Sequence, residues 1–429
     1  MTHLRRLALI FALASGLCLV SMPSALPAAK PFSTQQPFSK VGHDDWEPSV
    51  AADTAGHVYM ATTRYGGPNA CRGCPDPAIV LRRSSDGGRT WTKPGFICRC
   101  RGVEGQHDPV MVTDERGRVF MTWMNDFDVQ FARSDDFGRT WSRPGSLDGA
   151  LNFSDKPWIA VSPSGRDVYV FFNASDPYAV YSHNAGRTWS EPILTTRSGL
   201  YFFSGGATVT PDGTVLSSQA AYPQDEDGPI SLFVLRSSNG GKTWQTVGLD
   251  RSRKQPPCPS WAGCTAAYHG AQMAMASDAN GRIYVLYNAN KKREGPHRLY
   301  LRYSNDSGAT WSLPRQATRT RKRVDHEFPM IVAAGDGDVR IAWMDDRKRP
   351  GRRWNVFYRR STDGGRTWAQ RWRLSDRHGG APYKSARGFR FPYGDYGQLA
   401  LDGDGDVFAV WGEGPSYEGP GGSWYTHSR

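Results

Sequence analysis

Acidic residues recur in this chain shortly before short apolar segments that have the composition of β-strands. They are Glu47, Asp108, Asp155, Glu327 and Asp395, and four histidines lie close to this set, His43, His107, His269 and His326. Carboxylates that are brought together can act as a general acid and base pair or bind a cation. The same recurrence also fits a structural role, in which each carboxylate caps a turn or pairs with a neighbouring repeat. The sequence does not distinguish the two roles, because the distance between carboxylates of different repeats depends on the fold and does not follow from their separation along the chain.

Lysine and arginine are concentrated in four segments of the second half of the chain: Arg251, Arg253, Lys254; Lys291, Lys292, Arg293; Arg319, Arg321, Lys322, Arg323; and Arg347, Lys348, Arg349, Arg352, Arg353. The whole chain has a formal net charge of +12. Concentrated positive potential attracts acidic glycans or other polyanions. The candidate ligand-binding residues are therefore Arg321, Lys322, Arg323, Arg347, Arg352 and Arg353. The alternative is a solvated surface, and nucleic acid is not expected as a partner, because the chain has an export signal and no recognisable binding motif.

A short motif, Ser-x-Asp/Asn-x-Gly-x-Thr-Trp, occurs six times, at 84–91, 134–141, 182–189, 237–244, 304–311 and 361–368. Its acidic or amide residue can accept backbone N–H bonds in a tight turn, and its glycine can take a positive φ. The threonine hydroxyl can close the turn, and the tryptophan can fill the gap between neighbouring strands. We therefore assign structural roles to Asp86, Asp136, Asn184, Asn239, Asp306 and Asp363.

These motifs punctuate a longer repeat that predicts an all-β fold. Each motif follows a strand, and a hairpin of two alternating strands lies upstream, so one unit is a four-stranded antiparallel blade. Seven such units begin between Glu47 and Asp395, which predicts a β-propeller of about seven blades, six of them carrying the motif. Six blades is the alternative, if one hairpin is an insertion. The last unit lacks its outer strand, so a strand within 32–41 should complete it and close the ring, because an open ring would expose sheet edges.

The first residues read as an export signal. Arg5 and Arg6 precede an apolar run over 7–20 and a stretch of small residues over 21–29. We expect residues 1–29 to be a signal peptide and 30–429 to be one propeller domain, secreted or periplasmic. No later segment is apolar enough to cross a membrane.

Six cysteines follow the leader. In an oxidising compartment an even number of cysteines predicts disulfides, and Cys258 and Cys264 are close enough in one loop to pair. The sequence leaves open how the other four cysteines pair with one another: Cys71, Cys74, Cys98 and Cys100. Their four thiolates could instead bind zinc. Export favours disulfides, and we expect neither a metal nor a cofactor.

The repeated motif and its placement resemble the sialidase-like Asp-box, or BNR-repeat, superfamily over essentially the whole chain after the leader. The resemblance implies a propeller, and it is compatible with sialidases, other glycosidases and propellers without catalysis. Sialidases of this superfamily use three arginines, a Tyr–Glu nucleophile and an acid/base Asp. Their Arg-Ile/Leu-Pro motif is missing here, where Arg64 is followed by Tyr65-Gly66-Gly67. Arg390 and Tyr393 are the other candidates for the sialidase roles.

Three functions remain open from the sequence. The first is recognition of an acidic glycan or another polyanion, with or without catalysis. The second is glycoside hydrolysis, including an exo-sialidase with displaced motifs. The third is a scaffold for a protein partner.

Overall fold

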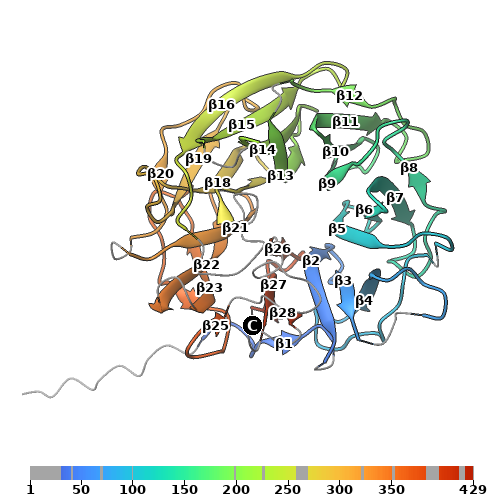
Figure 1. Cartoon of the computed structure of the whole chain (residues 1–429), viewed down its shortest axis with the longest axis horizontal. Helices are drawn as coiled ribbons and strands as arrows, with labels where there is room; N and C mark the ends of the chain where they lie inside the picture. Colours follow the sequence, from blue (N-terminus) through green and yellow to red (C-terminus); the bar gives the residue numbers. More distant parts are fainter. Residues whose placement is uncertain are drawn as a thin grey trace, which may run out of the picture. The chain divides into compact units, whose positions relative to one another are not determined.

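The strands form seven antiparallel sheets arranged as the blades of a propeller (Figure 1). This computed structural model describes residues 30–39, 42–67, 71–98, 100–197, 200–224, 228–257, 269–319, 323–349, 353–382, 396–414 and 421–428. Residues Phe32–Arg429 form one unit, to which the description below applies. The prediction of seven blades is confirmed. Among the described residues, no helix has the length and apolar character needed to span a bilayer.

Blades one to four follow the chain from the innermost strand outward. Blade one holds β2 (Asp44–Ala52), β3 (Val58–Gly66) and β4 (Ala78–Ser84); blade two holds β5 (Gln106–Thr113), β6 (Val119–Asn125), β7 (Asp128–Ser134) and β8 (Gly145–Ser146). Blade three holds β9 (Asp155–Val161), β10 (Val168–Ala174), β11 (Asp176–Ser182) and β12 (Ile193–Leu194); blade four holds β13 (Tyr201–Val209), β14 (Val215–Tyr222), β15 (Ile230–Ser237) and β16 (Gln245–Ser252). The fourth strand of blade one is reduced to a single bridge between Leu81 and Gly95.

Blades five to seven complete the ring. Blade five holds β17 (Met273–Ser277), β18 (Ile283–Ala289), β19 (Arg298–Ser304) and β20 (Arg315–Gln316); blade six holds β21 (His326–Ala333), β22 (Val339–Arg349), β23 (Arg353–Ser361) and β24 (Trp372–Arg373), with β25 (Ala381–Pro382) also paired to β23. Blade seven holds β26 (Gln398–Leu401), β27 (Val407–Glu413), β28 (Gly422–His427) and β1 (Gln36–Pro37).

Strands β1 and β28 close the ring. Gln36 pairs with Tyr425 and Pro37 with Trp424, and the Phe38 N–H donates to the Ser423 carbonyl at 2.8 Å. The N-terminal segment thus supplies the outer strand that the last blade lacks. The expected closure by a strand within 32–41 is confirmed over its described part, and Lys40 and Val41 lie outside the described residues.

The core lies between the blades. Strand β6 is buried along its whole length, because each of its faces packs against a neighbouring blade. Between blades one and two, Tyr59 and Leu81 pack against Met121 and Trp123. Dry packing of this kind supplies most of the stabilisation at about 25 cal/mol per Å² of apolar surface buried.

The repeated motif forms the same turn in its Asp and Asn versions. In the first copy the Thr90 N–H donates to Asp86 Oδ1 at 2.8 Å, and the Thr90 hydroxyl donates to Oδ2 at 2.6 Å. Gly88 takes a φ of 77°, which costs glycine little. In the third copy Asn184 accepts the same Thr188 N–H at 2.9 Å, while its amide donates to the Thr188 hydroxyl at 2.7 Å. The predicted structural role of the motif agrees with these contacts.

The motif tryptophans differ from the expectation in one respect. They fill gaps between blades and not gaps between strands of one blade. Trp91 of blade one meets Tyr425 of blade seven edge to face at 5.3 Å, and Trp189 of blade three meets Phe131 of blade two at 4.8 Å. Each turn therefore fixes its own blade and anchors a ring on the preceding one.

Strand direction places the loops on two faces. The innermost strands β2, β5, β9, β13, β17, β21 and β26 all begin on one side of the ring, which we call the mouth face. Because neighbouring strands are antiparallel, loops between second and third strands and connections between blades also lie there. The motif turns follow third strands and lie on the opposite face. The described residues of the four basic segments lie in these mouth-face connections or at the strand ends beside them, as Arg251 does in β16 and Arg347 in β22.

The four described cysteines form two disulfides, Cys71–Cys74 and Cys98–Cys100. The alternative of a zinc site at these thiols is therefore wrong. Their sulfur atoms pair within each short loop. Cys258 and Cys264 lie outside the described residues.

The turn chemistry predicts a contrast between two variants at one position. The Thr310 hydroxyl and backbone N–H lower the pKa of Asp306 to about 2. Asp306→Asn should fold with little loss, because Asn184 already builds the same turn, whereas Asp306→Ala should lose about 1–3 kcal/mol of unfolding free energy. Urea unfolding at pH 7 measures both changes.

The same variants carry a pH signature. A carboxylate whose pKa falls on folding contributes stability above about pH 4, and this contribution is lost as the pH falls toward about 2. Wild-type stability should therefore drop more steeply across that window than the stability of Asp306→Asn. Parallel curves for the two proteins would contradict a charge-dependent turn.

Candidate functional site on the mouth face

A repeated β-bulge shapes the rim of the mouth face. In four innermost strands one extra residue interrupts the pairing with the second strand. At each bulge a non-glycine residue takes a left-handed φ of 50–56° and a proline follows; these residues are Glu47, Asp108, Lys156 and Phe328. Such conformations cost about 1–3 kcal/mol each and persist where the surrounding structure imposes them. Bulges re-aim side chains, so the rim side chains are held in fixed directions.

The bulges show that the carboxylates predicted to form one ring are not structurally equivalent. Glu47 and Asp108 occupy the left-handed position, but Asp155 and Glu327 come one residue earlier, before Lys156 and Phe328. The recurring acids therefore belong to two different structural positions. Lys156 is the residue of blade three that matches Glu47 and Asp108, and it brings a cation to the rim. Asp395 lies outside the described residues.

Blades one and two join through a tyrosine held between an acid and an imidazole. The Tyr65 hydroxyl donates to Glu47 Oε1 at 2.7 Å and lies 3.0 Å from His107 Nδ1. The other Glu47 oxygen accepts the Asp108 N–H at 3.0 Å. Burial lowers the pKa of His107, so the imidazole is neutral at neutral pH. A phenol in contact with a carboxylate and a neutral imidazole can lose or gain a proton.

Asp108 connects blades two, three and seven. Lys156 Nζ lies 3.1 Å from Asp108 Oδ2, and the Tyr396 hydroxyl donates to Asp108 Oδ1 at 3.1 Å. The ammonium of Lys156 also sits 5.3 Å from the ring centre of Phe203 in blade four. A buried ion pair of this kind fixes geometry more than it stabilises the fold.

Asp155 lies beside this ion pair at the start of β9. Its Oδ2 accepts a hydrogen bond from the Tyr201 hydroxyl of blade four at 2.8 Å. Burial raises the pKa of Asp155, and the nearby charge of Lys156 only partly opposes this. A carboxyl group with a raised pKa is suited to donate a proton.

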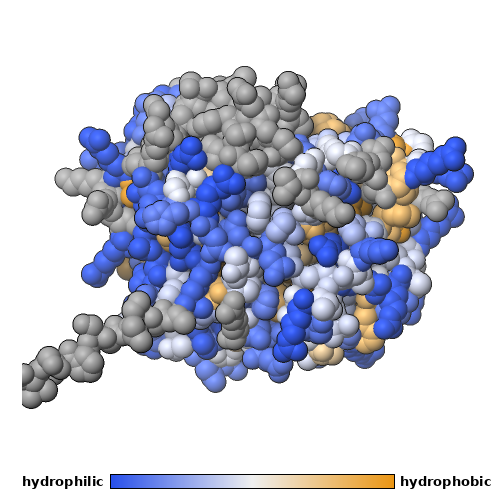
Figure 2. Space-filling model, turned by 90° about the horizontal axis from the view of Figure 1, so that it is seen from below, coloured by the Kyte–Doolittle hydropathy of each residue, from blue (hydrophilic) through white to orange (hydrophobic). Residues whose placement is uncertain are grey.

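Exposed aromatic rings flank the contacts of Tyr65 with Glu47 and His107, which we call the tyrosine cluster. Phe127 and Phe153 are 36% and 59% exposed and stack at a centroid distance of 4.4 Å. Phe127 also stacks on His107 at 5.7 Å. Apart from Leu313, these two are the only strongly exposed large hydrophobic residues in the described part of the chain, and the view in Figure 2 shows a surface that is mostly hydrophilic. Two adjacent exposed rings on such a surface mark a place of contact.

The backbone holds both rings in an unfavourable conformation. Asp126 and Phe127 form the two-residue turn between β6 and β7 with φ values of 50° and 66°, and Phe153 has a φ of 60°. Turns of this type favour Asn-Gly, since both central residues have positive φ. A phenylalanine in the glycine place offers no backbone advantage. What Phe127 contributes to this turn is therefore its exposed ring.

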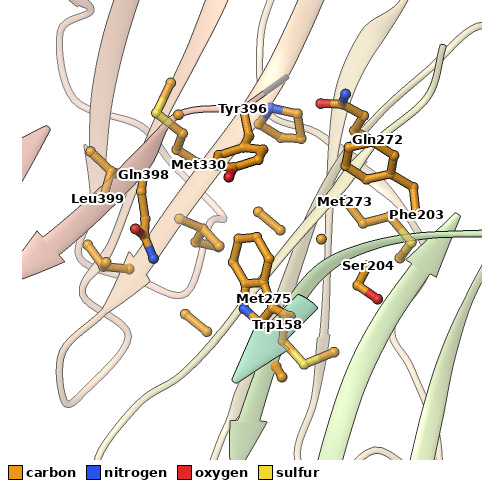
Figure 3. Close-up of a pocket in the computed structure, with 18 of the residues that line it drawn as sticks. Trp158, Phe203, Ser204, Gln272, Met273, Met275, Met330, Tyr396, Gln398 and Leu399 are labelled. Carbon is orange, nitrogen blue, oxygen red and sulfur yellow. The ribbon is translucent and has the colours of Figure 1, made fainter. Parts of the chain in front are cut away.

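A pocket lies among the innermost strands below the rim. Its volume is about 180 Å³, and its walls include Met273, Met275, Met330 and Leu399. Figure 3 shows the rings of Trp158 and Tyr396 facing this space, and their centroids are 6.3 Å apart. Gly205 lies in the wall because a Cβ there would collide with the Met273 carbonyl oxygen. Sites for small molecules usually enclose about 300–1,000 Å³, so this space is too small to hold an oligosaccharide.

Glu327 lies apart from the tyrosine cluster. It is buried between blades five and six with His269, His297 and Asp325. Burial raises its pKa well above the ordinary value. The structure therefore divides the predicted acidic ring into one group at blades one to three and a second group at blades five and six.

The predicted arginines are placed unevenly. Arg64 is buried, and its guanidinium contacts both oxygens of Asp45 at 2.8 and 3.3 Å, so its charge is already balanced. Arg347 pairs with Asp345 and covers the Phe357 ring. Arg323 is exposed, and Arg353 donates to the Gly380 carbonyl at 3.2 Å. Arg321, Lys322, Arg352, Arg390 and Tyr393 lie outside the described residues.

Several residues of the site were missed by the sequence analysis: Tyr65, Lys156, Tyr201, Tyr396, Phe127 and Phe153. One signal was available for Lys156. The dipeptides Glu47-Pro48, Asp108-Pro109 and Lys156-Pro157 align the three bulges. No comparable pattern marks the tyrosines, because their partners come from other blades.

Comparison with known proteins agrees with this architecture. The BNR repeat-like domain family matches residues 158–408. The chain belongs to the BNR repeat-like family. It is 24% identical over 371 residues to a sialidase of Micromonospora viridifaciens, an alignment that covers 72% of this chain and 54% of the sialidase. The chain thus spans about half the length of that relative.

Solved structures share the fold of this BNR-repeat propeller. A Dyadobacter fermentans protein of unknown function aligns with a TM-score of 0.53 at 15% identity, covering 93% of this chain and 99% of that one. An ulvan lyase of polysaccharide lyase family PL25 aligns with a TM-score of 0.52 at 14% identity, covering 90% and 95%. At these identities the likeness extends to the fold alone.

The Asp108–Lys156 pair predicts strong coupling between two substitutions. Their side chains are 2% and 9% exposed. Lys156→Met or Asp108→Asn alone should each lower the unfolding free energy by about 3–5 kcal/mol if a buried charge is left unpaired. The double variant should lose clearly less than the sum. Urea unfolding of all four proteins measures the coupling, and strictly additive losses would rule out a mutual charge contact.

Proposed function

We propose that this BNR-repeat propeller binds an acidic carbohydrate on its mouth face, over blades one to three. The observation that carries the proposal is the exposed, stacked pair Phe127 and Phe153 beside the Tyr65 cluster. Aromatic faces pack against the apolar faces of sugar rings, while carboxylates, amines and hydroxyls bind sugar hydroxyl groups. Both kinds of group stand side by side here.

The acidic character of the ligand is inferred from charge. The chain carries a formal net charge of +12, and the described cations of its basic segments lie on the same face as the aromatic pair. Some of these cations are neutralised: Lys291 contacts Asp250 at 2.7 Å, and Arg347 contacts Asp345. The remaining positive potential would attract an anionic chain to the mouth face. The sialidase relative and the ulvan lyase neighbour, both named for carbohydrate substrates, support a carbohydrate ligand.

Cleavage of the bound glycan is a second candidate, favoured by Tyr65. Its oxygen could bond to the anomeric carbon while its proton passes to Glu47. The glycosidic C–O bond would break as the leaving oxygen takes a proton from Asp155, whose raised pKa suits an acid. This pairing of Tyr with Glu agrees with the sialidase resemblance in chemistry but uses blade one and not the C-terminal part of the chain.

The binding proposal predicts the effect of removing the aromatic pair. Phe127→Gly/Phe153→Gly relieves two left-handed phenylalanines, so stability should not fall and is expected to rise. Binding to heparin or sialylated glycans should weaken by about tenfold or more, since each stacked ring contributes on the order of 1 kcal/mol. Isothermal titration and urea unfolding measure the two effects separately.

Leu313→Ala provides the matched control, because Leu313 is 83% exposed but follows a motif turn on the opposite face. It should leave binding unchanged. A separate variant, Arg321→Ser/Lys322→Ser/Arg323→Ser, tests the basic segments. It should bind the glycan more weakly than wild type, and this difference in affinity should shrink as salt is added. Unchanged affinity in the double glycine variant would contradict the placement of the site over blades one to three.

The cleavage candidate predicts a loss of turnover without a loss of binding. Tyr65→Phe should lower the hydrolysis of susceptible aryl glycosides by about 100-fold or more, with glycan affinity kept within a few-fold. Screening wild type and variant against a panel of aryl glycosides measures this. Absence of turnover in the wild type would leave recognition alone as the function.

A further inference from the structure

Four buried side chains with metal-ligand chemistry meet between blades five and six. His269 precedes β17, His297 precedes β19, and Asp325 and Glu327 flank the start of β21. Their side chains are 4%, 0%, 6% and 1% exposed. The aromatic pair and the tyrosine cluster make no use of them. Two carboxylates buried together need a compensating positive charge.

The distances between these groups match the edges of a coordination shell. His297 Nδ1 lies 2.9 Å from Glu327 Oε1 and 3.1 Å from Asp325 Oδ1. His269 Nδ1 lies 3.3 Å from Glu327 Oε1. Ligands bound at about 2.0–2.2 Å from one ion stand roughly 2.8–3.6 Å apart in octahedral and tetrahedral sites. One ligand atom each from His269, Asp325 and Glu327 fits within 4.8 Å.

One oxygen at the centre of the cluster has no hydrogen bond. Within the described part of the chain, the buried Glu327 Oε1 accepts none, although two imidazole nitrogens lie within 3.3 Å of it. His297 Nδ1 is instead hydrogen-bonded to Asp325 Oδ1 at 3.1 Å. A buried acceptor left in this state costs about 1–3 kcal/mol. An ion bonded to Oε1 would remove that cost.

The surrounding groups orient the cluster as outer partners of metal ligands do. Asn288 donates to Glu327 Oε2 at 2.8 Å. Asp325 Oδ1 accepts the backbone N–H of His297 at 2.6 Å. The second oxygen of Glu327 is thereby fixed by a neutral donor, which leaves Oε1 turned toward the imidazoles. Outer partners of this kind hold the ligand geometry and tune metal affinity.

We propose that His269, Asp325 and Glu327 bind one divalent transition-metal ion, with Zn²⁺ as the preferred ion and His297 as an outer partner that holds the two carboxylates. An imidazole with two carboxylates suits zinc, with water in the fourth position, whereas calcium and magnesium prefer oxygen ligands alone. The three ligands are buried and come from blades five and six, so the ion would clamp these two blades together at the mouth face. The ion would revise the expectation from the sequence that the chain needs no metal.

Metal content tests the proposal directly. The full-length protein is dialysed against EDTA and titrated with ZnCl₂ by calorimetry, and its melting temperature is followed in parallel. Wild type should bind one Zn²⁺ per chain and melt at a higher temperature with zinc than without. Glu327→Gln should bind at least about 100-fold more weakly, since losing outer partners alone costs about 10–100-fold. His183→Gln is the matched control, because His183 pairs with Asp167 at 2.8 Å far along the chain from the cluster.

Cobalt keeps the test decisive if Glu327→Gln fails to fold. Co²⁺ added to the wild-type apoprotein should produce the visible absorption bands of a four-coordinate ion, and one equivalent of Zn²⁺ should abolish them. Absence of these bands, together with no zinc-dependent rise in melting temperature, would overturn the proposal. The cluster would then be a hydrogen-bonded network around a protonated histidine. Equal zinc affinity in wild type and a folded Glu327→Gln variant would overturn it as well.

Discussion

The pairing of β1 with β28 is the constraint on which the rest of this propeller depends. It converts an open row of sheets into a ring, so that blade seven packs against blade one. Across that junction the Ser49 hydroxyl donates to Gln398 Oε1 at 2.8 Å, and the Gly421 N–H donates to Asp44 Oδ1 at 2.9 Å. Closure is also what brings Tyr396 of blade seven to Asp108 of blade two. The Tyr396–Asp108 contact of the mouth-face site therefore depends on the closed ring.

Left-handed residues other than glycine occur on both faces of the ring. In three copies of the motif turn the residue before the shared glycine is Phe137, Ala185 or Ser307, with φ between 51° and 60°. On the mouth face Glu47, Asp108, Lys156, Phe127 and Phe153 take the same conformation. The two faces differ in what these residues present: Phe137 stacks on His57 of blade one, whereas Phe127 and Phe153 are 36% and 59% exposed and the bulge residues direct Lys156 onto Asp108. This exposure is the physical reason for assigning ligand contact to the mouth face.

Much of the fold could be predicted from the sequence because its determinants are local. A six-fold turn motif with fixed spacing specifies blades, and the missing outer strand of the last blade implies closure by the N-terminal segment. The same reasoning predicted that the basic segments lie on one face. These inferences need only strand direction and turn chemistry, which are encoded in consecutive residues.

The site could be predicted only in part because its contacts join different blades. Glu47 and Asp108 were found from their recurrence, and the bulge dipeptide Lys156-Pro157 could have added Lys156, but no pattern marks Tyr65, whose partner His107 comes from blade two. Asp155 and Glu327 come one residue earlier than Glu47 and Asp108 relative to the bulge proline, so they are not equivalent to them. Asp155 still lies beside the Asp108–Lys156 pair, whereas Glu327 belongs to a second cluster because its partners His269 and His297 come from blade five.

A crystal structure of the protein with a bound acidic oligosaccharide would show directly whether the ligand lies over blades one to three. We expect a sugar ring stacked on Phe127 or Phe153, with its hydroxyl groups in contact with the Tyr65–Glu47 pair. An oligosaccharide bound on the opposite face, or only along the basic loops of blades four to six, would contradict this expectation.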